Sequence, residues 1–214
     1  MTSLLLEKCE SLTAIEIDKD LIRFLKKTYG DRKNFNLIEK DILLYDPKEL
    51  LRVNKLIGNI PYNISTPIIE WIIDNKSSFD EIFLMLQKEF GERCVAQPNT
   101  KSYGRLSIFV QCFFDVTVIR EVDKSSFTPS PKVQSIFLKL IPKVSDMTPN
   151  SLLMKNLSTL TREAFSKRRK LITNSLKSFF TEEDLVNLGI DRKSRPENLS
   201  VETYIKLAKS IQSG

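Results

Sequence analysis

The sequence predicts an α/β fold followed by a helical tail. In the first hundred residues, short apolar or β-branched runs alternate with segments of helical spacing, which is typical of βα units and a mostly parallel sheet. After about Gly104, two strand-like runs follow one another without a helix between them, which indicates an antiparallel pair. Beyond Pro142 only helical patterns remain.

The strands expected in the first half are each followed by a helix-start or turn signal. Asp18 precedes a segment whose apolar residues have helical spacing, and its carboxylate can cap that helix. Pro67 stands in the first turn of another expected helix, where proline is tolerated, and a charged helix is expected from Gln87. The expected strands are Leu12–Ile17, Phe35–Ile38, Lys55–Gly58 and Asp80–Leu86.

The second half contains two strands and a set of helices. The strands Phe113–Val122 and Gln134–Ile141 are joined by a loop rich in serine and proline. The polar segment Lys143–Asn150 contains proline and marks a domain boundary, so we expect one domain over residues 1–143 and a small all-helical domain over residues 144–214. The expected helices are Ser151–Phe165, Lys170–Phe180, Glu182–Leu188 and Val201–Ile211.

The composition of the 214 residues excludes several classes of protein. There is no histidine, which removes Ser-His-Asp and Cys-His catalysis and histidine-ligated zinc. Six isolated glycines form no phosphate-binding glycine loop of either common kind. Three well-separated cysteines suggest neither a disulfide framework nor a metal site, and they fit a reduced, cytoplasmic compartment. No apolar run approaches the roughly 20 residues of a membrane span.

The charge is unevenly distributed. The chain carries a net charge of +6, and residues 144–214 hold 12 basic and 8 acidic side chains in a third of the length. A basic surface is compatible with nucleic acid, because contacts to phosphates release counterions. A solvated charged surface is an equally open interpretation.

Two acidic residues stand at predicted strand ends, where α/β sheets bind their ligands. Glu16 ends the first strand and could accept hydrogen bonds from two neighbouring ribose hydroxyls. Asp41 occupies the corresponding place one βα unit later and could accept from an adenine amine, with the Ile42 amide and side chain beside the ring. Each could instead be a surface, capping or turn acid.

The segment Gly58–Tyr62 is the most specific signal in the chain. Pro61 fixes its own φ and restricts Ile60 to extended conformations, so the segment forms a stiff wall at a strand end. The Asn59 amide and the carbonyls of this wall could accept both hydrogens of a planar amino group. The ring of Tyr62 could stack on the heterocycle that bears the amine. A chance turn of the same composition is the alternative.

Two further features point to nucleic acid. Phe127 begins a loop (Phe127–Val133) with two prolines, which holds an aromatic ring where a base could stack, unless the ring packs against the core.

A basic run lies inside an expected helical segment and consists of Lys167, Arg168, Arg169 and Lys170. Four successive cations cannot all lie on one helix face. Arg162 and Lys177 extend this patch, which could bind an RNA or DNA backbone or simply solvate a helix.

Taken together, these residues and several longer sequence strings closely resemble the ribosomal RNA adenine N6-dimethyltransferases, which use S-adenosylmethionine. The matching strings span nearly the whole chain in the family's order, and the C-terminal one resembles the small-subunit branch. They are AIEID, the Asp41 turn, GNIPYNISTPII, MLQKEFGERCVAQP, YGRLSIFVQ, FTPSPKVQS, RRKLITNSLKS and GIDRKSRPENLSVETYIKLA. The resemblance implies a Rossmann-like methyltransferase sheet and a helical RNA-binding domain.

The resemblance also implies a role for each matched residue. Glu16 and Ile17 would hold the cofactor ribose, and Asp41 and Ile42 its adenine, while Asn59 would lie between the cofactor and the target amine. With the Ile60–Pro61 wall, Asn59 would favour a pyramidal nitrogen and expose its lone pair for in-line transfer. The implied stacking partners of a flipped-out adenine are Tyr62 and Phe127.

Compared with the family, the chain lacks a first strand and a glycine-rich turn, which would contact the methionine end of the cofactor. The resemblance implies dimethylation of adjacent adenosines in small-subunit rRNA or a pre-30S-type particle, by a cytoplasmic monomer that needs no metal and binds no membrane. Two alternatives stay open. The chain could be a catalytically impaired RNA-binding or ribosome-assembly protein of the same fold, or a macrolide-resistance-type 23S rRNA adenine methyltransferase.

Overall fold

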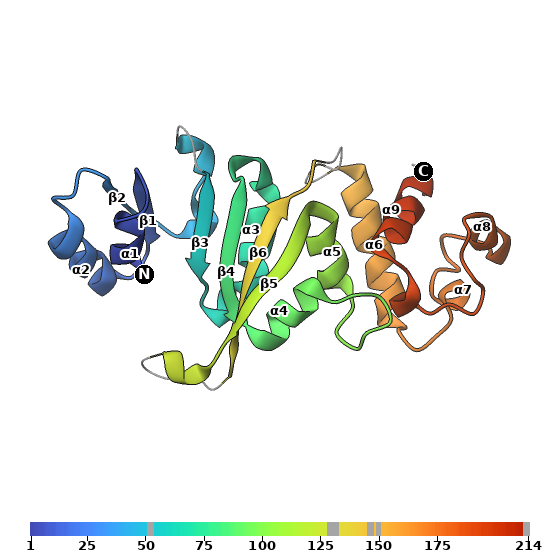
Figure 1. Cartoon of the computed structure of the whole chain (residues 1–214). Helices are drawn as coiled ribbons and strands as arrows, with labels where there is room; N and C mark the ends of the chain where they lie inside the picture. The colour runs from blue at the N-terminus through green and yellow to red at the C-terminus, as the bar shows by residue number, and fades with distance from the viewer. Residues whose placement is uncertain (51–53, 128–132, 145–147, 149–150, 212–214) are drawn as a thin grey trace. The chain divides into compact units, whose positions relative to one another are not determined.

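The computed structural model describes residues 1–50, 54–127, 133–144, 148 and 151–211 (Figure 1). It divides into two compact units, residues 1–50 and residues 51–214. Both α-helices and β-strands are present in the order that the sequence predicts, with parallel pairs first, an antiparallel pair next and helices last. No helix among the described residues is long and apolar enough to cross a membrane.

The first unit contains one parallel pair of strands and two α-helices. These are α1 (Thr2–Leu6), β1 (Leu12–Glu16), α2 (Lys19–Tyr29) and β2 (Phe35–Glu39). Leu12 pairs with Phe35 and Glu16 with Glu39, so the carboxyl ends of both strands lie at the same edge. The predicted cap is present, because the Asp18 carboxylate accepts hydrogen bonds from the backbone N–H groups of Asp20 and Leu21.

The second unit is built on a four-stranded sheet in the order β3-β4-β6-β5. β3 pairs parallel with β4, whereas β6 runs antiparallel to both of its neighbours, as the sequence predicts for the last two strands. The strands are β3 (Lys55–Asn59), β4 (Glu81–Gln87), β5 (Phe114–Val122) and β6 (Ser135–Pro142). The helices are α3 (Ser65–Asp74), α4 (Lys88–Val95), α5 (Arg105–Phe113), α6 (Leu152–Ser166), α7 (Ile172–Ser175), α8 (Glu182–Asn187) and α9 (Val201–Ser210).

One face of this sheet forms the core of the second unit. Alternate residues of β4 are fully buried, among them Leu84, and Leu138 of β6 lies opposite in the same face. Gly91 allows α4 to lie directly on this face, since a Cβ there would come within 2.1 Å of the Ile136 side chain. Helix α5 packs against β5, α6 and α9 and so joins the sheet to the C-terminal helices (Figure 1).

Two expectations about the helices differ from the structure. The sequence patterns do not predict α5, because its β-branched and aromatic residues resemble those of a strand. Of the expected helix Lys170–Phe180, only Ile172–Ser175 is α-helical. The predicted boundary Lys143–Asn150 falls inside the second compact unit, since α5 packs on the C-terminal helices across it. A division into residues 1–143 and 144–214 stays a prediction.

Candidate active site and RNA-binding residues

The structure places Glu16 and Asp41 at one sheet edge. The Glu16 carbonyl accepts a hydrogen bond from the N–H of Lys40 at 3.1 Å, which ties the end of β1 to the residue just before Asp41. The half-buried Glu16 carboxylate accepts through Oε1 from the N–H groups of Ile17 (2.8 Å) and Asp18 (2.9 Å). These bonds hold the carboxylate in one orientation.

Asp41 is also held by its own backbone. Its Oδ1 accepts from the N–H of Leu43 at 2.9 Å and caps the short 3-10 helix Ile42–Leu44. The capping interpretation of this residue is therefore confirmed. Capping occupies one oxygen, and no hydrogen bond between described residues is recorded for Oδ2 of Asp41 or for Oε2 of Glu16. The sidechain of Ile17 is 65% exposed at the same edge, which leaves an apolar surface beside the two acids.

The segment Asn59–Tyr62 continues β3 and is anchored on three sides. The Ile60 N–H donates to the Met85 carbonyl at 3.1 Å and extends the pairing with β4 by one residue. The Tyr62 hydroxyl lies 3.1 Å from Oγ of Ser135, at the start of β6. Behind it, Ser65 donates its hydroxyl hydrogen to the Tyr62 carbonyl at 3.0 Å. A stiff segment at a strand end, as the sequence predicts, is present.

The carbonyls of this segment are not equivalent. The Pro61 carbonyl accepts from the N–H of Ile64 at 3.1 Å, within the turn that leads into α3. Among the described residues, no hydrogen bond to the Ile60 carbonyl is recorded. The Asn59 side chain is exposed. An amide oxygen and one backbone carbonyl are thus available within three residues.

Phe127 lies apart from this segment in the chain and is half-buried. It follows the 3-10 helix Lys124–Ser126, which Asp123 caps; the N–H of Ser125 bonds its carboxylate and lowers the pKa of Asp123. No ring contact between Tyr62 and Phe127 is recorded among the described residues. The rest of the predicted proline loop, residues 128–132, lies outside the described residues.

The basic run corrects a prediction. It does not lie inside a helix: α6 ends at Ser166, and the Lys170 N–H donates to the Lys167 carbonyl at 2.8 Å in a turn. Lys167 leaves the helical region with φ −122° and ψ 41°. In a turn, successive side chains are not forced around a helix axis. Five of the six predicted RNA-binding cations have exposed side chains and are in no recorded ion pair among described residues: Arg162, Lys167, Arg169, Lys170 and Lys177.

Arg168 is the exception. Its Nε donates to Oε2 of Glu197 at 2.5 Å and its Nη2 to the Thr100 carbonyl at 3.2 Å. These partners come from segments distant in the sequence, so nothing in the basic run itself could have indicated them. The same holds for the bond between Tyr62 and Ser135, although the resemblance had included Ser135 in a matching string.

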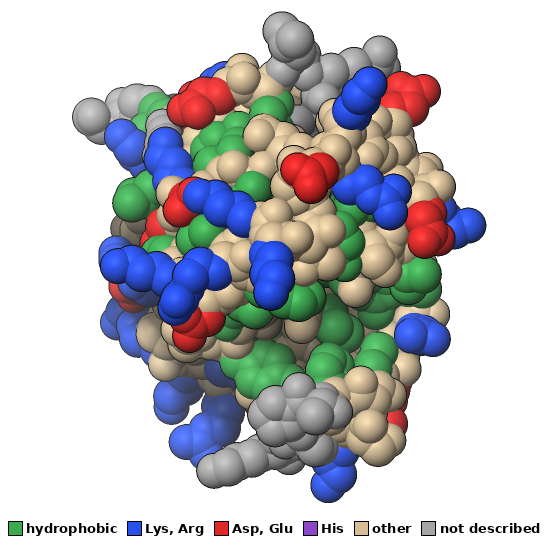
Figure 2. Space-filling view, turned by 90° about the vertical axis from the view of Figure 1, so that its left-hand side faces the viewer, with side chains coloured by type: hydrophobic (Ala, Val, Ile, Leu, Met, Phe, Trp, Pro, Cys, Tyr) green, Lys and Arg blue, Asp and Glu red, His purple; other side chains and the backbone are tan. Residues whose placement is uncertain are grey.

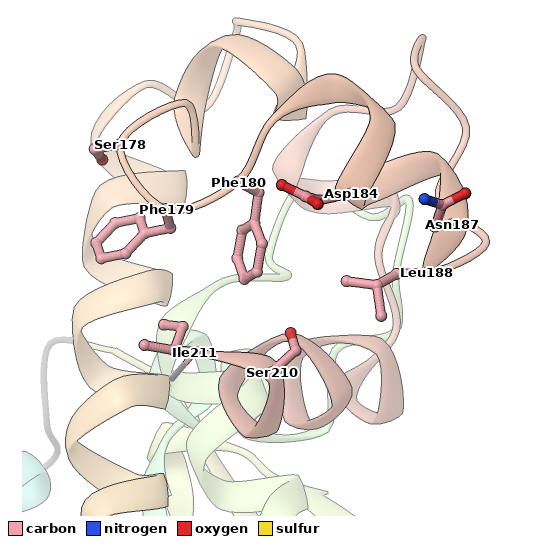
Figure 3. A pocket seen from close by; sticks show the side chains of 8 residues that line it. All are labelled: Ser178, Phe179, Phe180, Asp184, Asn187, Leu188, Ser210 and Ile211. Carbon is pink, nitrogen blue, oxygen red and sulfur yellow. The ribbon is translucent and has the colours of Figure 1, made fainter. Parts of the chain in front are cut away.

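Other surface features lie away from these residues. A pocket of about 570 Å³ is lined by Phe179, Phe180, Leu188 and Ile211 with a few polar neighbours (Figure 3), and none of the predicted site residues reaches it. On the face in Figure 2, lysine and arginine side chains are scattered among acidic ones, so charge alone marks no nucleic-acid site there. In the described part of the chain, no group of three or more His, Cys, Asp or Glu side chains could hold a metal ion.

Comparison with known proteins connects these observations to a family. The sequence model described as ribosomal RNA adenine dimethylase matches residues 1–213. Proteins named ribosomal RNA small subunit methyltransferase A from Coxiella burnetii and Legionella pneumophila are 36% and 39% identical to the chain. These alignments cover 99% and 100% of the chain, and 82% and 83% of the two relatives.

Solved structures show the same fold. A dimethyladenosine transferase from Plasmodium falciparum has a TM-score of 0.80 and 30% identity, over 96% of this chain and 83% of that one. The 23S rRNA methyltransferase ErmE has a TM-score of 0.73 and 21% identity, over 98% and 85%, which supports the fold alone. The predicted Rossmann-like methyltransferase class is confirmed, and the chain belongs to the ribosomal RNA adenine dimethylase family of enzymes.

Proposed function

We propose that this chain transfers methyl groups from S-adenosylmethionine to the N6 amines of adjacent adenosines in small-subunit rRNA. Its family and the names of its relatives support this function. The observation that carries it is the anchored segment Asn59–Tyr62, which offers two acceptors and an aromatic ring at a strand end. No histidine is needed, because the target nitrogen becomes acidic once it has been methylated and then loses its proton.

The residues at the edge of β1 and β2 fit the adenosine part of the cofactor. Glu16 and Asp41 each have one oxygen held by backbone N–H groups and a second with no hydrogen bond among the described residues. Glu16 would accept from the ribose hydroxyls and Asp41 from the adenine amine, while Ile17 and Ile42 would pack beside them. When bound, S-adenosylmethionine supplies an electrophilic methyl group on sulfur.

The segment Asn59–Tyr62 would prepare the target amine. The lone pair of an adenine amine is delocalised into the ring, so the amine is a poor nucleophile. Asn59 Oδ1 and the Ile60 carbonyl would each accept one amine hydrogen and so favour a pyramidal nitrogen with an exposed lone pair. Of the two wall carbonyls, we assign this role to that of Ile60, because the Pro61 carbonyl is already bonded to Ile64.

The flipped adenine would be held by stacking. The ring of Tyr62 is fixed through its hydroxyl on Ser135, so it would form one face of the base site without reordering. Phe127 would form the other face, and stacking on an aromatic ring contributes roughly 1–3 kcal/mol per base. The exposed cations Arg162, Lys167, Arg169, Lys170 and Lys177 would contact the RNA backbone.

Two alternatives are kept. A 23S rRNA substrate is less favoured, since the relatives at 36–39% identity are named for the small subunit and the 23S enzyme is 21% identical. A catalytically impaired assembly protein of the same family would bind rRNA without methylating it. An assay that measures binding and methyl transfer separately distinguishes this alternative from the enzyme.

The proposed role of Asn59 is tested by Asn59→Ala. We expect single-turnover methylation of a small-subunit rRNA fragment to fall by about 100-fold or more, because an acceptor for the reacting amine is lost. RNA affinity in filter binding should change by less than about twofold, since no phosphate contact is removed. The matched control is Asn63→Ala, an exposed asparagine in the following 3-10 helix Tyr62–Ile64.

A near-normal rate for Asn59→Ala would remove this residue from the mechanism. If the unaltered chain binds the rRNA and transfers no methyl group, the impaired assembly protein is the correct assignment. If it methylates a 23S fragment in preference to a small-subunit fragment, the substrate proposal is wrong.

A further inference from the structure

The turn Lys167–Lys170 presents three exposed cations and one that points elsewhere. Lys167, Arg169 and Lys170 are exposed, whereas the side chain of Arg168 is only 36% exposed to solvent. Its guanidinium binds the Glu197 carboxylate and the Thr100 carbonyl. The planar fork of an arginine suits two such acceptors at once, which a lysine could not reproduce.

Thr100 lies in a loop and Glu197 in the 3-10 helix Pro196–Asn198, and these two segments are bound to each other independently of Arg168. The N–H of Asn99 donates to the Glu197 carbonyl at 2.8 Å, and the Asn198 amide donates to Oδ1 of Asn99 at 2.7 Å. Asn99 has a φ of +69°, a left-handed conformation that asparagine tolerates better than most residues. The hydrogen bonds that hold the two acceptor segments together therefore do not depend on Arg168.

Two buried tyrosines hold the backbone on either side of Glu197. The Tyr103 hydroxyl donates to the Leu199 carbonyl at 2.9 Å, and the Tyr204 hydroxyl donates to the Pro196 carbonyl at 2.8 Å. Both tyrosines are fully buried, and the ring of Phe165, one residue before the end of α6, lies within 6.3 Å of each ring centroid. Glu197 thus stands on a rigid support.

A contact between Arg168 and RNA would require breaking existing hydrogen bonds, which the neighbouring exposed cations need not do. To reach a phosphate, the guanidinium would leave Glu197 and Thr100, and the Glu197 carboxylate would then stand unneutralised near a polyanion. Staying bound, Arg168 neutralises that carboxylate and holds the backbone of the turn against the 99–100 and 197–198 segments.

We propose that Arg168 is a positioning residue for rRNA binding: paired with Glu197 and Thr100, it holds the turn so that Lys167, Arg169 and Lys170 face the RNA backbone. This rests on the proposed function, which supplies the rRNA substrate, and it replaces the direct RNA contact that the sequence suggested for Arg168. Binding energy then comes from the three exposed cations, and Arg168 determines where they stand.

Glu197→Gln gives opposite results for the two roles. If Arg168 contacts RNA, removing an acidic side chain frees the guanidinium and rRNA binding becomes tighter. If Arg168 positions the turn, the same change weakens rRNA binding by about 2- to 10-fold, although an unfavourable negative charge has been removed. Glu163→Gln is the matched control, because Glu163 is a nearby acid that has no ion pair among the described residues; this variant should bind slightly tighter or as before.

Two further measurements complete the test. Arg168→Gln should weaken binding about as much as Glu197→Gln, and the double variant should bind no worse than either single one, because both changes break the same contact. In methylation assays with the full chain, KM for the rRNA fragment should rise by the same factor while kcat stays within about twofold. General damage to the fold would lower kcat as well, and thermal melting of each variant checks that it is folded.

Tighter or unchanged binding by Glu197→Gln overturns the positioning role. Should that variant not fold, Arg168→Lys decides: it keeps the charge but loses the fork, so positioning predicts weaker binding and a direct contact predicts unchanged binding. The proposed function fails separately, if the unaltered chain binds no small-subunit rRNA. If Arg169→Gln weakens rRNA binding while Glu197→Gln strengthens it, the positioning role is wrong but the proposed function stands.

Discussion

Residues 1–50 and residues 51–214 differ in how well their elements are packed. In the first unit, the buried side chains are Leu6, Ile22, Tyr45 and Pro47, and both strands are at most half-buried. In the second, β4 and β6 have fully buried residues at alternate positions, and helices cover that face. A two-stranded sheet is only marginally stable by itself, whereas a sheet of four strands with one packed apolar face can be stable on its own.

The proposed roles follow the same division. The acids proposed for the cofactor, Glu16 and Asp41, stand on the sparsely packed unit. The segment Asn59–Tyr62 and the support of Arg168 stand on the well-packed one. Under the proposed function, the base and the RNA backbone would meet preformed surfaces, while order in residues 1–50 would depend more strongly on what binds there.

The largest expected effect is on hydrogen exchange. Backbone amides of β1 should exchange about 1000-fold faster than those of β4, because local opening needs far less free energy where few side chains are buried. Exchange measured by mass spectrometry on the full chain would show this directly. Equal protection of the two strands would mean that both units open as one cooperative body, and the comparison would be wrong.

Cysteine reactivity gives a second contrast. Burial raises the pKa of Cys94 and of Cys112 to about 12, whereas Cys9 in the first unit is a free, half-buried thiol. At pH 8 we expect a thiol reagent to modify Cys9 at least about 100-fold faster than the other two, since the thiolate is the reacting form. Peptide mapping would locate the label, and Cys9→Ser should abolish the fast phase. Rapid labelling of Cys94 would show that the core of the second unit opens easily.

Truncation of apolar side chains should separate the units by free energy of unfolding. Leu84→Ala removes a fully buried side chain from β4 and should destabilise the protein by about 2–5 kcal/mol. Leu44→Ala removes a side chain that is 73% exposed in the first unit and should change stability by less than about 0.5 kcal/mol. Urea unfolding would measure both. A large loss for Leu44→Ala would mean that residues 1–50 bury more apolar surface than the comparison allows.

The smallest expected effect concerns a carboxylate that joins three strands. Hydrogen bonds from Lys139 and Lys55 lower the pKa of Glu81 to about 2, from an ordinary value of 4.5. Because the folded pKa is the lower one, this stabilisation is present above about pH 4.5 and is lost as the pH falls toward 2. Glu81→Gln should therefore lower Tm by a few degrees at pH 7, with the difference shrinking below pH 4.5.

Glu49→Gln is the matched control in the first unit. Glu49 faces Lys40 at 3.9 Å with most of its side chain exposed, so its loss should leave Tm nearly unchanged at any pH. Calorimetric scans between pH 3 and 7 would compare the two variants. A pH-independent Tm loss for Glu81→Gln would assign its effect to packing and not to charge.

The sequence by itself determined the local elements and the family. The apolar run within Asp80–Leu86 predicted a buried strand, and Asp18 predicted a helix start, because these signals act between residues close in the chain. Pro61 predicted the stiff segment for the same reason. The matching strings predicted the family and its fold, both confirmed, whereas the roles of the site residues stay predictions.

Only the tertiary structure decided which distant groups meet. Arg168 reads in the sequence as one of four equal cations, yet it lies against Glu197 and Thr100, 29 and 68 residues away, while its neighbours stay exposed. Tyr62 is fixed by Ser135, 73 residues on. Helix α5 forms from residues whose local preference is for a strand, because its buried face packs against β5, α6 and α9. In each case the deciding free energy comes from partners that local sequence patterns do not encode.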